Sequence, residues 1–117
     1  MKFNRVQLIG RLTADPEIKD IIWNDEGKDT PGVVTTFTLA VSRYKKDITD
    51  FFQVQLYNGK GKRAHEYLRK GSLVLVEGSI QLDRVEQDHK GIKFTNTYTT
   101  IKATEFQSLE KKPVKVA

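Results

Sequence analysis

The stretch at residues 51–57 carries the side chains whose types and spacing most suggest binding chemistry. As a strand with alternating side chains, it directs Phe52, Val54 and Leu56 to one face, which we expect to enter the core. The other face then presents two aromatic rings around two amides: Phe51, Gln53, Gln55 and Tyr57. Exposed rings beside polar donors form a platform for nucleobases, and each stacked base contributes about 1–3 kcal/mol whatever its identity. The open alternative is that these rings cover a subunit interface or a loop.

Basic residues stand on both sides of this stretch in the chain. The candidates for contacts to phosphate, together with one further ring, are Arg43, Tyr44, Lys45, Lys60 and Lys62. Basic groups interleaved with aromatic rings suit a polyanion that also offers bases, because each neutralised phosphate releases counterions. The alternative is a solvated loop and a solvated helix start. Lys60 and Lys62 would oppose the dipole of the helix expected there, so something other than helix stability must account for them.

Composition bounds the class of protein without identifying its partner. The 117 residues suffice for one domain with its own core, and the net charge of +5, with a pI near 9.5, favours an anionic partner. The chain has no cysteine, which excludes disulfides and most zinc sites. It has neither a run of about 20 apolar residues nor a signal-peptide pattern at its start. We expect a cytoplasmic protein without a membrane segment.

Catalytic constellations are poorly represented in this sequence. The only carboxylate cluster is Asp83, Glu86 and Asp88, and it is interrupted by Arg84 and Lys90. We interpret it as a solvated turn rather than a metal site, and the two histidines stand alone in the chain. We therefore expect no catalytic residue, no metal and no cofactor, and a protein that is not an enzyme.

The dominant hydrophobic period is two, which indicates strands. The expected strands are residues 5–12, 18–23, 33–42, 51–57, 73–82 and 92–106. One helix is expected at 61–70, between the strands 51–57 and 73–82. Provided that 18–23 pairs with its neighbour, this order predicts an all-β fold, a five-stranded Greek-key OB-fold barrel with one short α-helix between strands. Strand number alone leaves SH3-like barrels and sandwiches open, and the position of the helix favours the OB fold.

Turn-forming residues divide these elements. Dense turn formers predict loops at 24–32 and 83–91. Gly71 stands where a left-handed helix cap is usual, and Gly78 predicts a bend or bulge in its strand. We find no linker or internal repeat that would divide the chain.

Four blocks of sequence occur in an order typical of a known family. They are NRVQLIGRL at 4–12 with DPE at 15–17, TFTLAVSR at 36–43, TDFFQVQLY at 49–57, and YLRKGSLVLVEG at 67–78. Together they resemble the bacterial-type single-stranded DNA-binding protein family, with a looser match to about residue 109. Any one block is weakly specific, whereas four in the same order are strongly specific.

The resemblance implies an OB fold that wraps single-stranded DNA on aromatic rings and basic grooves, in a homotetramer or alternatively a dimer. The family's stacking rings fall on Phe51 and Tyr57, the pair that alternation places outside the core. Its basic residues fall on Arg5 in the first strand and on Arg84 near the later hairpin. Arg11, on the same face of the first strand as Arg5, completes the predicted contact set. Replication or recombination proteins are the further partners that the resemblance suggests.

The sequence also departs from the family pattern. Val85 stands where many members carry another aromatic ring, the hairpin at 20–32 is enlarged, and the loop at 43–50 is short. The end at 110–117 is basic, whereas tailed members end in an acidic tip that recruits other enzymes. We expect an OB domain at 1–109 and a short basic tail that recruits no partner in that way. Such a chain is either a longer one cut short or a tailless member, for example a phage- or plasmid-borne one.

The sequence thus predicts nonspecific binding and protection of single-stranded DNA during replication, recombination or repair. An RNA-binding OB protein is one alternative. An OB protein-interaction module, using the same sheet face as an interface, is another. A small OB-fold nuclease would need a metal-holding set of carboxylates that the sequence does not offer.

Overall fold

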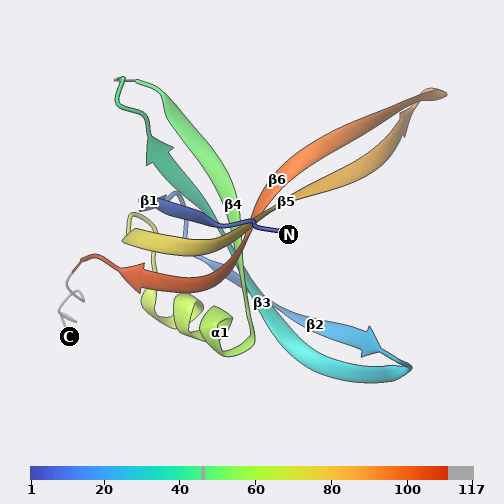
Figure 1. Ribbon diagram of the computed structural model, residues 1–117, viewed down its shortest axis with the longest axis horizontal. Helices are drawn as coiled ribbons and strands as arrows, with labels where there is room; N and C mark the ends of the chain where they lie inside the picture. Colours follow the sequence, from blue (N-terminus) through green and yellow to red (C-terminus); the bar gives the residue numbers. More distant parts are fainter. Residues whose placement is uncertain (46, 111–117) are drawn as a thin grey trace.

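The computed structural model describes residues 1–45 and 47–110, and strands account for most of them. In chain order the elements are β1 (Val6–Leu12), β2 (Glu17–Asp25), β3 (Lys28–Ser42), β4 (Thr49–Tyr57), α1 (Asn58–Tyr67), β5 (Leu73–His89) and β6 (Ile92–Ser108). Three long hairpins, β2–β3, β3–β4 and β5–β6, diverge from a common centre, with α1 beside it (Figure 1). The prediction of an all-β fold with one short helix is confirmed.

All six strands belong to one sheet in the order β1-β5-β6-β4-β3-β2. A short additional pairing of β1 with β3, through Arg11 with Ala40 and Leu12 with Leu39, brings the sheet round on itself. β4 and β6 run parallel, and the other pairs are antiparallel. β2 is the strand additional to the five of the predicted barrel. It pairs with β3 along its whole length, and the predicted topology depends on this pairing.

The core is formed by the inward side chains of the strands and one side of α1. Its fully buried members include Leu39, Val54, Leu56, Ala64, Leu68, Val74, Val76 and Ile101. The helix is tied to the sheet by the buried Thr35 hydroxyl, which donates to the Gly61 carbonyl at 2.6 Å. In β4, Val54 and Leu56 are buried in this core, so the opposite face of the strand points outward.

Two of the predicted loops are mostly strand. β2 continues to Asp25 and β3 begins at Lys28, so residues 26 and 27 alone form the turn. The β5–β6 hairpin likewise turns at residues 90 and 91. Both turns have positive φ at both central positions, which matches the twist of a two-residue hairpin. Hairpins at 24–32 and 83–91 are therefore confirmed, but their loops are much shorter than predicted, because cross-strand pairing outweighs the local preference of turn-forming residues.

The helix ends earlier than predicted, whereas the predicted bulge is confirmed. α1 ends at Tyr67, and Leu68 is already extended, so Gly71 does not cap the helix. The Gly71 amide instead donates to the Leu12 carbonyl at 2.8 Å, in the turn that leads to β5. In β5 the pairing with β6 shifts register between Glu77 and Gly78. This bulge bends β5 where it leaves the core for the long hairpin.

Candidate nucleic-acid interface

The outward face of β4 carries the predicted rings and amides. Val54 and Leu56 are fully buried, while Phe51 is 65% exposed and Gln53 is exposed. Gln55 and Tyr57 are half-buried on the same outward face. The predicted alternation in this strand is confirmed.

Neighbouring strands extend this face with small polar side chains and one cation. On β3, Thr38 pairs with Gln53 and Thr36 with Gln55. On β6, Lys102 is the partner of Gln55. The Lys102 ammonium donates to the Tyr57 hydroxyl at 2.8 Å and to the Gln55 amide oxygen, and lies 5.3 Å from the centroid of the Tyr57 ring. We call the outward side chains of β4, with Thr36, Thr38, Thr100 and Lys102, the β4 face.

Exposed rings continue from β4 onto the β5–β6 hairpin. Tyr98 and Phe94 alternate along β6 on the side of Lys102, and their exposed fractions are 48% and 41%. They flank Asn96, which is the partner of Val85 on β5. Two rings from the facing strand thus surround Val85, the position where the resemblance leads one to expect an aromatic side chain. Sequence reasoning overlooked both rings, although strict alternation within β6 would have placed them together.

Four of the predicted cations are ion-paired in the described chain. The Arg43 guanidinium donates to both oxygens of Asp50, at 2.9 and 3.0 Å. Arg11 binds Glu110 at 2.6 Å and the Gly71 carbonyl at 2.9 Å. The other two pairs are Arg5 with Glu77 and Lys60 with Glu105. A phosphate would have to share each of these cations with a carboxylate or displace the carboxylate.

These pairs lower the pKa of their carboxyl groups. The hydrogen bond from Arg43 holds the pKa of Asp50 below its ordinary value, and that from Arg11 does the same for the pKa of Glu110. The pKa of Glu77 is lowered first by the hydrogen bond from Gln7 and then by the charge of Arg5. The carboxylates therefore stay ionised, and compete for their arginines, at neutral pH.

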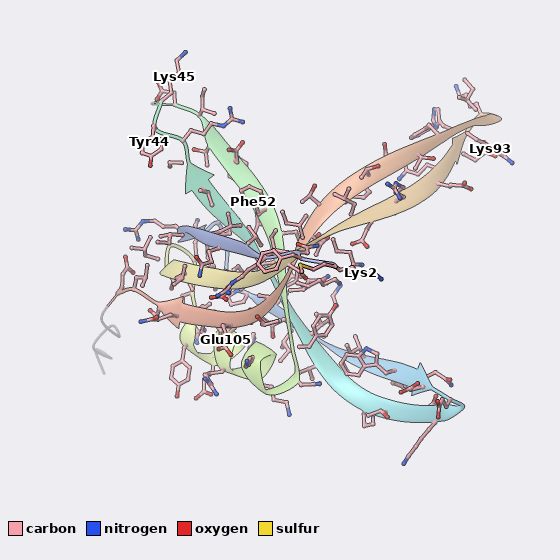
Figure 2. The ribbon with its side chains drawn as sticks, viewed as in Figure 1. Lys2, Tyr44, Lys45, Phe52, Lys93 and Glu105 are labelled. Atoms are coloured by element: carbon pink, nitrogen blue, oxygen red, sulfur yellow. The ribbon has the colours of Figure 1, made fainter. Side chains whose placement is uncertain are left out.

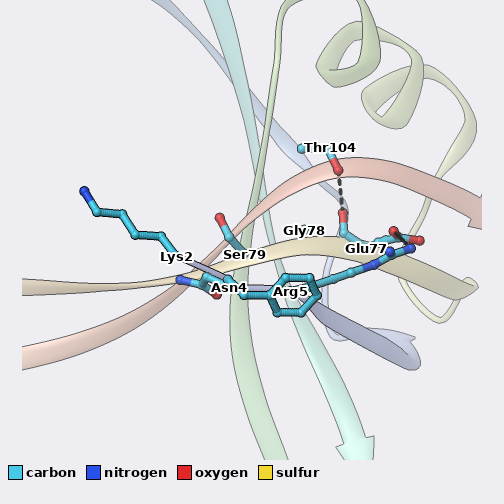
Figure 3. Close-up of a pocket in the computed structure, with 8 residues that line it drawn as sticks. Lys2, Asn4, Arg5, Glu77, Gly78, Ser79 and Thr104 are labelled. Carbon is cyan, nitrogen blue, oxygen red and sulfur yellow. Dashed lines mark hydrogen bonds and ion pairs between the residues drawn. The ribbon is translucent and has the colours of Figure 1, made fainter.

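The Arg5 pair lies in a cavity at the start of β1. Figure 3 shows Arg5 against Glu77 of β5, with Lys2 and Ser79 nearby. The Asn4 side chain donates to the Ile80 carbonyl at 2.7 Å and accepts from its amide at 2.9 Å. The side-chain amide of Asn4 thus continues the hydrogen bonding between β1 and β5 beyond the start of β1.

The remaining predicted residues lie at three separate places. Tyr44 and Lys45 occupy the tip of the loop between β3 and β4, where Tyr44 is fully exposed (Figure 2). Lys62 is exposed on α1, and Arg84 lies on the side of β5 opposite to the rings. Arg11 is closer to the rings, because it pairs with Ala40, whose other partner is Phe51. The structure brings Phe51, Gln53, Gln55, Tyr57 and Arg11 onto neighbouring strands, and it leaves Lys62 and Arg84 apart from them.

Lys60 illustrates why a cation stands at a helix start. Its ammonium reaches the Thr104 carbonyl at 2.5 Å and the Glu105 carboxylate on β6. The unfavourable position relative to the helix dipole is offset by this contact between α1 and the sheet.

The carboxylates of β5 do not gather into a metal site. Alternation places Asp83 on the opposite side of the strand from Glu86 and Asp88. Hydrogen bonds from Gln81 and Thr100 lower the pKa of Asp83. Within residues 1–45 and 47–110, no three carboxylate or histidine side chains are arranged to bind a metal ion. Over the same residues, no helix is both long and apolar enough to cross a membrane.

Comparison with known proteins places the chain in a family. Residues 3–109 match the family described as "Single-strand binding protein family". A "Single-stranded DNA-binding protein" of Thermotoga maritima is 41% identical over 72% of this chain and 60% of its own length. "Single-stranded DNA-binding protein 1" of Synechocystis is 33% identical over 78% and 72% respectively. A Clostridium tetani relative is 42% identical over 67% and 52%.

The matched segments thus span between about half and three quarters of the relatives' lengths. The basic segment 111–117 lies outside the described residues. The prediction that it recruits no partner in the way of an acidic tip therefore stays a prediction. The match to residues 3–109 confirms the resemblance seen in the sequence, and with it the OB fold. Since the family consists of binding proteins, the expectation that this chain is not an enzyme is confirmed. The chain belongs to the single-strand binding protein family.

Proposed function

We propose that this protein binds and protects single-stranded DNA without sequence preference during replication, recombination or repair. The observation that carries this proposal is the β4 face, where Phe51 and Tyr57 are presented outward on either side of Gln53 and Gln55. Every base has a π-face, so stacking on these rings tolerates any sequence. Bases in a duplex are already stacked on one another, and the same rings cannot reach their faces.

The chemistry of binding divides between rings, amides and cations. The distance from Phe51 to Tyr57 along β4 is six residues, or about 20 Å, which accommodates several nucleotides. Between the rings, the amides of Gln53 and Gln55 offer hydrogen bonds to base edges. The cations supply the phosphate contacts, and each arginine exchanges its carboxylate for a phosphate on binding. No catalytic step, metal or nucleotide is needed, and a reducing cytoplasm suits a chain without cysteine.

Salt dependence tests the contribution of the phosphates. We expect the logarithm of the affinity for oligo-dT to fall linearly with the logarithm of salt concentration, by about 0.7 for each phosphate neutralised. Fluorescence anisotropy of a labelled oligonucleotide at four or five salt concentrations gives the slope. A flat response would contradict phosphate binding and would favour a protein-interaction module. Oligo-rU in parallel separates DNA binding from the RNA-binding alternative.

Asp50→Asn is expected to strengthen binding to oligo-dT. The change frees the Arg43 guanidinium from its carboxylate, so the salt slope should become more negative by about 0.7, the value for one additional phosphate contact. Asp47→Asn is the matched control. It removes the same charge three residues earlier in the chain, and the Asp47 side chain takes part in no ion pair among the described residues. Equal effects of the two changes would show that net charge alone is responsible, and would exclude Arg43.

We further propose that the chain acts as a homo-oligomer, a tetramer as the resemblance implies or alternatively a dimer. β1 pairs with β5 from Val6 to Arg11, but with β3 only at its last two residues. On the edge of β1 that faces away from β5, residues 6–10 therefore have no strand partner among the described residues. Ile9 on the outer face beside it is 54% exposed and pairs with Leu75. An open strand edge with adjacent apolar side chains is suited to pairing with another copy.

The mass in solution tests this assembly. Light scattering should give four times the chain mass of 13.4 kDa, with twice that mass as the outcome for a dimer. Ile9→Asp should lower the mass, because it places a charge in the interface. A wild-type mass of one chain at micromolar concentration would contradict the assembly while leaving the binding proposal intact.

A further inference from the structure

The β2–β3 hairpin carries a tryptophan held in a specific position. Trp23 pairs with Thr30, and its ring lies over the backbone of Gly32 in β3. A Cβ atom at Gly32 would stand 2.0 Å from Cζ3 of the ring. The ring can therefore occupy this position only because residue 32 is a glycine, which has no side chain. Trp23 also reaches the edge of the β4 face, where its ring centroid is 5.8 Å from that of Tyr57 at an interplanar angle of 50°. Tilted pairs at this separation are favourable for aromatic rings.

Both rings are fixed in place and remain accessible. The Tyr57 hydroxyl donates to Gln55 at 3.0 Å and accepts from Lys102 at 2.8 Å, which holds the ring. Trp23 is 37% exposed and Tyr57 is half-buried, so each side chain keeps a part that solvent can reach. Rings that are immobilised but open bind a base at little entropic cost.

A polar hollow adjoins the two rings on the same outward side. It has a volume of about 240 Å³ and is lined by Glu17, Lys19, Val34, Thr36, Gln53 and Gln55. Val34 is the cross-strand partner of Tyr57, which places the hollow next to that ring. The amides and the threonine offer donors and acceptors for a base edge, and Lys19 offers a charge for phosphate. The hollow thus connects the ring pair to the middle of the β4 face.

We propose that Trp23 and Tyr57 together form a nucleobase-stacking subsite, which extends the path of single-stranded DNA from the β4 face onto the β2–β3 hairpin. This inference rests on the proposed function. It adds a contact that the shorter hairpin expected from the resemblance would not reach, and it assigns to the enlarged hairpin a share of the binding energy.

The single tryptophan makes this subsite directly observable. Oligo-dT is titrated while two signals are recorded: anisotropy of a labelled oligonucleotide for binding, and intrinsic tryptophan emission for contact at Trp23. The emission should be quenched along the same binding curve. Trp23→Ala should weaken binding by about 5- to 150-fold, the range for one stacked base, and Trp23→Phe should restore part of the loss.

Two further variants separate stacking from damage to the hairpin. Ile22→Ala truncates an exposed apolar side chain on the other side of the same strand, and should leave the affinity unchanged. Gly32→Ala retains the tryptophan but displaces its ring, so quenching should decrease together with affinity.

The outcomes distinguish this inference from the function on which it rests. Binding by anisotropy with unchanged tryptophan emission would overturn the subsite and leave single-strand binding intact. The subsite would also be overturned if the wild-type emission is quenched but Trp23→Ala binds oligo-dT as tightly as wild type. Absence of any anisotropy change with the wild-type protein would instead overturn the proposed function.

Discussion

Phe51→Ala is expected to weaken the binding of oligo-dT by about 1–3 kcal/mol, and Tyr57→Ala by a similar amount. Both rings project from the outward face of β4, so truncation removes a stacking surface without opening the core. Tyr57→Phe keeps the ring and loses the hydroxyl that accepts from Lys102 and donates to Gln55, so its affinity should fall much less than that of Tyr57→Ala. Anisotropy titrations give the affinities, and thermal unfolding checks that each variant is folded.

Leu82→Ala is the control for this comparison. It truncates an apolar side chain that is 51% exposed on β5, on the side of the strand opposite to the rings. Its affinity should equal that of wild type. Unchanged affinity in both Phe51→Ala and Tyr57→Ala would contradict the stacking platform and would leave the β4 face as an interface or a loop-covered surface.

Leu56→Ala is expected to lower the free energy of unfolding by about 2–5 kcal/mol. Leu56 is fully buried in the core, between the two outward residues Gln55 and Tyr57. Its truncation removes apolar contacts and leaves a cavity that the closed sheet fills only partly. Urea denaturation followed by far-ultraviolet circular dichroism measures the change.

Gln53→Ala on the exposed side of the same strand provides the comparison. A surface substitution of this kind changes the free energy of unfolding by about 0.5 kcal/mol or less. A large loss in Gln53→Ala together with a small one in Leu56→Ala would contradict the orientation of β4, because a shift of one residue exchanges the two faces of a strand.

The orientation of β4 could be predicted from the sequence because it depends on local periodicity alone. Alternation places Phe51 and Tyr57 on the side opposite to Val54 and Leu56, and burial in the structure follows this pattern. The hairpin ends could not be predicted in the same way. Residues such as Asn24 and Asp29 favour turns by themselves, but in the structure their side chains hydrogen-bond across the β2–β3 ladder at 2.9 Å.

Contacts between distant parts of the chain account for the rest of what the sequence could not predict. Lys102 reaches Tyr57 only because β6 lies parallel to β4, and no local pattern indicates that pairing. The arginines were recognisable as candidate phosphate ligands from residue type. Their carboxylate partners were not, since Arg11 and Glu110 are 99 residues apart in the chain. Before binding, the folded protein therefore offers fewer unpaired cations to a polyanion than the number of Lys and Arg residues suggests.

The most direct test of single-strand binding compares oligo-dT with a duplex of the same length and label, by anisotropy at a salt concentration of about 0.2 M. Phosphate contacts alone act on both, whereas the rings of the β4 face act only on unpaired bases. We predict that oligo-dT binds at least tenfold more tightly, a difference of about 1.4 kcal/mol or more. Equal affinity for the two, or tighter binding of the duplex, would contradict the account.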